Sequence, residues 1–121
     1  MHNLKTINVA HSPDADDIFM YAAVKFGWVS SKNLAFTSKA LDIETLNEEA
    51  LKGTYEATAI SFALYPKICD EFALLRCAVS FGNGYGPKLI KLKDKQLKRN
   101  FKVALSGKNT TNALLFRIAY P

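Results

Sequence analysis

Hydrophobic residues recur along the chain at spacings that change repeatedly between two and about 3.6, the signal of alternating strands and helices. The pattern predicts a strand at residues 7–10 and a helix at 13–26 that ends at Gly27. The helix carries one apolar stripe, which consists of Ile18, Phe19, Ala22, Ala23 and Phe26. The first unit is therefore a strand followed by a helix.

Two further units repeat this order. Strand 34–41 precedes helix 44–52, and strand 57–61 leads into an apolar helical segment in which Pro66 is tolerated only in the first turn. This order predicts an α/β fold in which helices cover both faces of a parallel sheet. The residues expected to face its core are Leu46, Ala50, Leu51, Leu64 and Ile68.

The pattern changes after Leu75, and a turn-rich stretch at 82–87 precedes alternating apolar residues. We predict a first α/β unit at 1–87, a crossover or hinge strand at 88–94 and the beginning of a second α/β unit at 95–121. The elements expected there are strand 88–92, helix 95–100, strand 102–105 and helix 111–120. So few elements cannot bury a parallel sheet from both sides. We therefore expect an incomplete second unit.

An incomplete second unit leaves the apolar face of its helix uncovered. That face consists of Ala113, Leu114, Leu115, Ile118 and Ala119. Exposed apolar patches of this kind favour association. We expect self-association, or exchange of the C-terminal segment between two chains.

Composition places the chain among globular proteins. Its 121 residues are 49% hydrophobic and 22% charged, and no window approaches the ~18 apolar residues of a membrane span. The N-terminus lacks the features of a secretory signal, so a cytoplasmic location without a membrane partner is expected. Cys69 and Cys77 lie in apolar surroundings without metal-ligand spacing, which predicts reduced packing residues.

Charge is distributed unevenly along the chain. Residues 1–71 hold six lysines against ten acidic residues, a net charge of −4, whereas residues 72–121 hold ten basic residues against Asp94 alone, a net of +9. Such asymmetry fits an acidic ligand or a nucleic-acid surface. Because no aromatic residues are interleaved with the lysines at 88–99, we interpret them as a solvated face and expect no nucleic-acid partner.

Ligands of open parallel sheets bind beyond the carboxyl ends of the strands, which directs attention to the loops that follow them. After the first strand, Ser12 suits a helix N-cap and Pro13 the first helical position, and the aspartates complement the helix dipole. A metal site would draw on His11, Asp14, Asp16 and Asp17. We favour the cap and a cleft wall over the metal.

The loops after the second and third strands offer oxygen atoms. Asp42 or Thr45 caps the following helix, or alternatively Asp42 or Glu44 accepts hydrogen bonds from ligand hydroxyls. Ser61 lacks the flanking glycines of a nucleophile elbow, so hydrogen bonding to a ligand is preferred, with N-capping close behind.

The loop at 106–111 contains Gly107 and Lys108 but lacks the spacing of a phosphate-binding loop. It precedes a helix N-terminus with two threonine hydroxyls, Thr110 and Thr111, which suits a carboxylate. A plain N-cap role for Thr110 is the alternative.

Five motifs in order and register give the chain a family resemblance. HSPDADDIFM (11–20), DIETLN (42–47), TAIS (58–61), GYGP (84–87) and GKNTT (107–111) resemble the dihydroxynaphthoate synthase family of the futalosine route to menaquinone. The resemblance implies a two-lobed fold like the type II periplasmic solute-binding proteins, of which this chain is the first lobe and the beginning of the second. It also implies a lyase that releases 1,4-dihydroxy-6-naphthoate from cyclic dehypoxanthine futalosine without a metal or organic cofactor.

The resemblance also implies a binding site for a small carboxylate substrate. The expected substrate-binding residues are Ser12, Asp16, Asp42, Ala59, Ile60, Ser61, Gly86, Thr110 and Thr111. Family members are more than twice as long, and neither His2 nor His11 matches their general base, so we expect the chain alone to be inactive. The family tends to carry a basic or polar residue at the position of Ala59 in this chain. At the position of Asn109 it tends to carry a histidine. A solute-binding module and a chorismate dehydratase-like enzyme share the fold and stay as alternatives.

Overall fold

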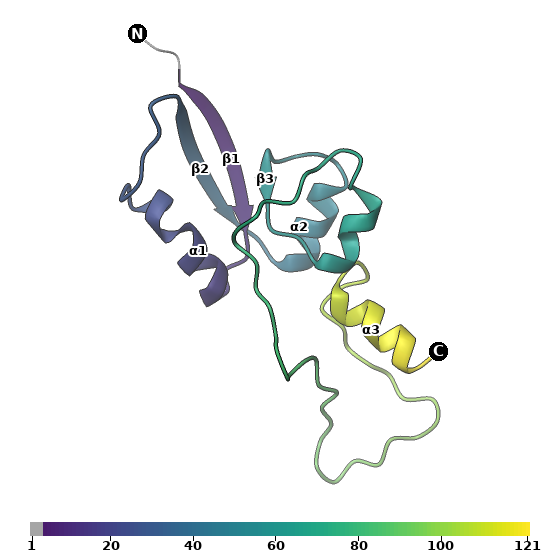
Figure 1. Cartoon of the computed structure of the whole chain (residues 1–121). Helices are drawn as coiled ribbons and strands as arrows, with labels where there is room; N and C mark the ends of the chain where they lie inside the picture. The colour runs from purple at the N-terminus through teal and green to yellow at the C-terminus, as the bar shows by residue number, and fades with distance from the viewer. Residues whose placement is uncertain (1–3) are drawn as a thin grey trace.

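A computed structural model describes residues 4–121 and shows a small parallel sheet with flanking helices, followed by a long extended segment that leads to a last helix (Figure 1). The elements are β1 (Lys5–His11), α1 (Ala15–Lys25), β2 (Leu34–Ala40), α2 (Ile43–Ala50), β3 (Ala57–Thr58), the 3₁₀ helix η1 (Phe62–Lys67) and α3 (Thr111–Ala119).

The sheet has the strand order β2-β1-β3, and both pairings are parallel. β1 pairs with β2 along its whole length, and Val9 and Ala10 pair with β3. Beyond the paired residues, the Ala59 N–H donates to the Ala10 carbonyl at 2.9 Å, so the chain leaving β3 stays beside the end of β1. The prediction of an α/β fold with a parallel sheet is confirmed, although β2 and β3 end earlier than expected.

The core lies where α2 and η1 meet the sheet. Four apolar side chains are buried there, namely Leu46, Ala50, Leu64 and Ile68, as the sequence predicts. The prediction for Leu51 is wrong, since it follows the end of α2 and is 47% exposed.

The apolar stripe predicted for α1 is only partly covered. Phe19 is 82% exposed and Phe26 63%, so the expectation that they face the core is wrong. Figure 1 shows α1 beside β2, which is one of the two edge strands of the sheet and has no further strand on its outer side. On its other side α1 contacts the sheet through Tyr21, whose ring stacks on His11 with centroids 5.1 Å apart.

Residues 73–110 contain neither strand nor helix, so the predicted strands at 88–92 and 102–105 and the helix at 95–100 are wrong. A strand needs a neighbour to pair its backbone groups, and the described residues supply none to this segment. A helix of six residues, three of them basic, is below the length at which helices persist without packing. Cys69 and Cys77 are exposed free thiols, which contradicts their interpretation as packing residues.

Three local predictions about helix ends also need correction. Pro13 lies before the N-cap of α1 and not at the first helical position. The N-cap of α1 is Asp14, and Ser12 instead accepts a hydrogen bond from the Asp14 N–H at 3.2 Å. Pro66 lies fifth in η1 rather than in the first turn. Its ring clashes with the carbonyl four residues earlier in an α-helix, which accounts for the 3₁₀ form.

Candidate functional site

The candidate site lies at the carboxyl ends of β1 and β3, which are neighbours in the sheet. Ser12 follows β1 and is 5% exposed, and Ser61 follows β3 and is 9% exposed. Ala59 and Ile60 lie half-buried between β3 and Ser61. The parallel topology therefore brings two buried serines to the same edge of the sheet.

Ser61 is held by a buried partner on α2. The Asn47 side chain accepts from the Ser61 N–H at 2.8 Å and donates to the Ser61 hydroxyl at 3.0 Å. Asn47 is completely buried. Sequence reasoning missed Asn47, and the available signal was a polar residue next to Leu46 on the buried side of an otherwise amphipathic helix.

Thr111, the first residue of α3, reaches the same loop. Its hydroxyl accepts a hydrogen bond at 3.2 Å from the N–H of Ala63, two residues beyond Ser61. The two residues are 48 positions apart, yet the contact places the N-terminus of α3 against the first turn of η1, just after Ser61. The loops predicted to form the two walls of a site are thus in contact.

Glu44 forms hydrogen bonds with the loop that precedes α3. Its carboxylate accepts from the Asn109 side chain at 2.9 Å and from the Asn109 N–H at 3.1 and 3.2 Å. Lys67 donates to the amide oxygen of Asn109 at 3.4 Å, and Lys108 pairs with Glu48 at 3.7 Å. We call this pair of residues the Glu44–Asn109 clamp. It was not predicted, because the contact joins residues 65 positions apart.

Thr110 adopts the role of N-cap. Its hydroxyl accepts from the Ala113 N–H at 3.2 Å and donates to the Gly107 carbonyl at 2.8 Å, and the residue is 3% exposed. Among the contacts of residues 4–121, none engages the N–H groups of Thr111 and Asn112. The first turn of α3 therefore keeps two donors beside the Thr111 hydroxyl.

Asp42 caps α2 by accepting from the N–H groups of Glu44 and Thr45, both at 3.1 Å, and from the Thr45 hydroxyl. The Thr45 hydroxyl, more than any other group, lowers the pKa of Asp42 below its usual 3.8. Asp16 is exposed, and a hydrogen bond from the Ser80 side chain lowers its pKa. Gly86 lies exposed within the extended segment, and no described contact connects it to Ser61 or Thr111.

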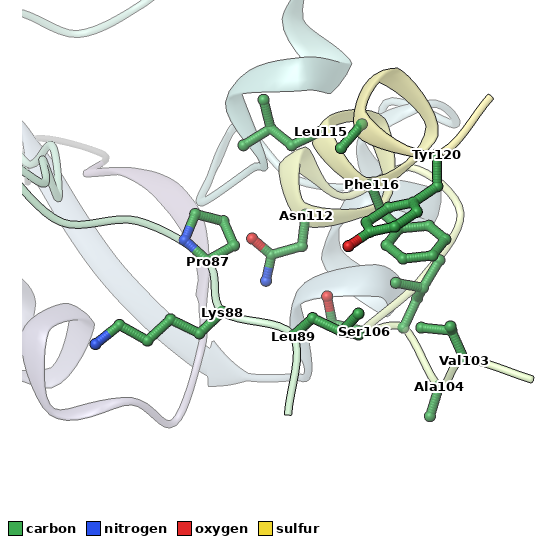
Figure 2. Close-up of a pocket in the computed structure, with 12 residues that line it drawn as sticks. Pro87, Lys88, Leu89, Val103, Ala104, Ser106, Asn112, Leu115, Phe116 and Tyr120 are labelled. Carbon is green, nitrogen blue, oxygen red and sulfur yellow. The ribbon is translucent and has the colours of Figure 1, made fainter. Parts of the chain in front are cut away.

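A separate cavity of about 490 Å³ lies between α3 and the extended segment. Figure 2 shows Asn112 pointing into it between Pro87 and Ser106, with the rings of Phe116 and Tyr120 on one side. None of the predicted site residues lines it. Leu114, Leu115 and Ile118 on α3 are 44%, 42% and 68% exposed, as expected for an unpartnered face.

Residues 4–121 hold no group of three or more His, Cys, Asp or Glu side chains placed to bind a metal ion. No helix among them is long and apolar enough to cross a membrane.

A family model described as menaquinone biosynthesis matches residues 7–121. A 1,4-dihydroxy-6-naphtoate synthase of Thermus thermophilus is 30% identical over 115 residues, which are 95% of this chain and 42% of that protein. The enzyme of the same name from Streptomyces coelicolor is 31% identical over 113 residues, 93% of this chain and 40% of that protein.

A crystal structure of a protein from Archaeoglobus fulgidus is also similar. It shares 44% identity at a TM-score of 0.64, over 67% of this chain and 30% of that one. The chain thus spans about two fifths of the length of the curated relatives it matches.

Proposed function

Because the chain belongs to the menaquinone biosynthesis family, we propose that it forms the substrate-binding part of a lyase that converts cyclic dehypoxanthine futalosine to 1,4-dihydroxy-6-naphthoate. The two curated relatives are each named 1,4-dihydroxy-6-naphtoate synthase, which supports the choice of product. The proposed fold is two-lobed, like that of the type II periplasmic solute-binding proteins, with this chain contributing the first lobe and the beginning of the second.

One observation carries the proposal, namely the contact between the Thr111 hydroxyl and the N–H of Ala63 in the first turn of η1, which begins directly after Ser61. It supports a single site bounded by the β1 and β3 loops on one side and by α3 on the other. The substrate carboxylate would bind the N–H groups of Thr111 and Asn112 and the Thr111 hydroxyl, because a helix N-terminus favours an anion. Ser12 and Ser61 would then contact the rest of the substrate.

The described part of the chain offers no histidine suited to general-base catalysis. The Nδ1 atom of His11 lies 2.7 Å from the Ser12 carbonyl, the ring stacks on Tyr21, and the residue is 3% exposed. A general base must reach the proton it removes, which a ring held in this way does not do. We therefore propose that the chain binds substrate and that the base belongs to the remaining part of the enzyme.

A chimera tests the proposal directly. The chain replaces the matching 42% of the Thermus thermophilus synthase, and the chimera is incubated with cyclic dehypoxanthine futalosine. We expect 1,4-dihydroxy-6-naphthoate as the product, and none from the 121-residue chain alone. A folded chimera that leaves this substrate intact but turns over chorismate would contradict the proposed substrate, and one that binds either molecule without turnover would contradict the proposed reaction.

A further inference from the structure

Ser61 occupies the N-cap position of η1 but does not cap it. A serine at this position ordinarily accepts a hydrogen bond from the N–H two or three residues on. Here the Ser61 side chain makes no cap hydrogen bond, and the Ala63 N–H donates instead to Thr111. Because the Thr111 hydroxyl accepts from the Ala63 N–H, the Ser61 hydroxyl does not cap η1 and can bind another group.

The orientation of the Asn47 amide follows from its partners. The Ser61 backbone N–H can only donate, so the Asn47 atom 2.8 Å away must be the oxygen. The Asn47 nitrogen then faces the Ser61 hydroxyl at 3.0 Å and donates to it. Asn47 is fully buried, so no solvent competes for either hydrogen bond.

These two hydrogen bonds fix what the Ser61 hydroxyl can offer. Its oxygen accepts from Asn47, and the hydroxyl donates no hydrogen bond to any of residues 4–121. Building on the proposed function, we infer that Asn47 is a positioning residue that makes Ser61 a hydrogen-bond donor toward the substrate. The site would accordingly select an acceptor oxygen at this point, as a carboxylate or carbonyl provides, and disfavour a ligand group that only donates.

The variant Asn47→Asp tests this inference because it keeps the size of the side chain. One carboxylate oxygen still accepts from the Ser61 N–H, but the other now accepts the Ser61 proton and thereby turns the hydroxyl into an acceptor toward the ligand. Ser61→Ala removes the hydroxyl altogether. The two single variants and the double variant form a double-mutant cycle. In the Ser61→Ala background, Asn47→Asp changes ligand binding only through its charge, so the cycle isolates the coupling between the two residues.

The ligands are 1,4-dihydroxy-6-naphthoate and its neutral carboxamide, and dissociation constants are measured by calorimetry on the chimera described above and its variants. We expect either single variant to bind 1,4-dihydroxy-6-naphthoate roughly 2- to 10-fold more weakly, the value of a hydrogen bond between uncharged groups, because the carboxylate itself binds at α3. In the Ser61→Ala background, Asn47→Asp should weaken binding of the carboxylate only through its charge and should leave binding of the neutral carboxamide nearly unchanged. Additive losses in the cycle would overturn the inference while leaving the proposed function intact.

A second measurement needs no ligand. In the NMR spectrum of the chain, Ser61→Ala should shift the Asn47 side-chain amide signals, because it removes their acceptor. Unchanged signals would overturn the inference. A parent protein that binds neither ligand would refute the proposed function as well, which separates the two failures.

Discussion

Gly107 provides the most direct test of how α3 is held against the sheet. Its φ of +146° is one that residues with a side chain rarely adopt. A Cβ atom added there would overlap Oε2 and Cδ of Glu44 and would lie 2.6 Å from its Cβ. Gly107→Ala therefore has to displace the carboxylate that binds Asn109.

The expected cost follows from two contributions. Backbone strain at a position of this kind costs about 1–3 kcal/mol. Asn109 is buried, and loss of its hydrogen bonds to the half-exposed Glu44 adds about 1.5–3 kcal/mol. A total of about 2.5–6 kcal/mol is comparable to the whole stability of a marginal domain. We expect α3 to detach while the buried cluster around Leu64 stays folded, since none of its contacts involves Gly107.

Amide hydrogen exchange measures this detachment residue by residue. In Gly107→Ala the N–H groups of α3 and of Ala63 should lose protection, whereas those of β1 should keep it. The matched control is Gly84→Ala, because Gly84 also has a positive φ, +75°, but has nothing within 4 Å of an added Cβ. Equal protection of α3 in Gly107→Ala and the parent, or an equal loss in Gly84→Ala, would refute the reasoning.

Three further predictions concern caps and the exposed helix face. Thr110→Val should destabilise α3 by about 1 kcal/mol through loss of the N-cap, seen as faster exchange of the Ala113 amide. The pKa of Asp42 is lowered, so its stabilising effect exists above its usual pKa of 3.8 and is lost as pH falls through the lower folded value. Asp42→Asn does not titrate, and its deficit in urea midpoint relative to the parent should shrink between about pH 5 and about pH 2. Finally, Leu115→Glu with Ile118→Glu should abolish self-association of the chain in sedimentation, whereas a parent that is monomeric at high concentration would contradict that expectation.

The first half of the fold was predictable because its pattern is local. Strand and helix periods, and terminators such as Gly27 and Gly53, depend on residues a few positions apart, and the structure places β1, α2 and their connections accordingly. The prediction of strands and a helix at 88–105 was wrong for the opposite reason. Alternation there indicates a strand, but a strand exists only when a partner pairs with it, and periodicity contains no information about partners.

The candidate site was predictable as a set of loops but not as a set of contacts. The rule that ligands bind beyond the strand ends selected Ser12 and Ser61, and the N-terminus of the last helix selected Thr111. The residues that hold these loops in place, Asn47 and Glu44, act across 14 and 65 positions and belong to no local motif. A polar residue on a buried helix face is the one signal that would have found Asn47.

The Glu44–Asn109 clamp also constrains where a substrate carboxylate binds. Glu44 already places a carboxylate on the Asn109 donors just before α3, and two negative charges about 4 Å apart repel by ~1–4 kcal/mol, depending on their exposure to solvent. A second carboxylate is therefore better accommodated at the N–H groups of Thr111 and Asn112, one turn away. Lys67, 3.4 Å from the Asn109 amide oxygen, offsets part of the repulsion. Hence Glu44→Gln, which keeps an acceptor for Asn109 but removes the charge, should tighten binding of 1,4-dihydroxy-6-naphthoate to the chimera and leave its carboxamide unaffected.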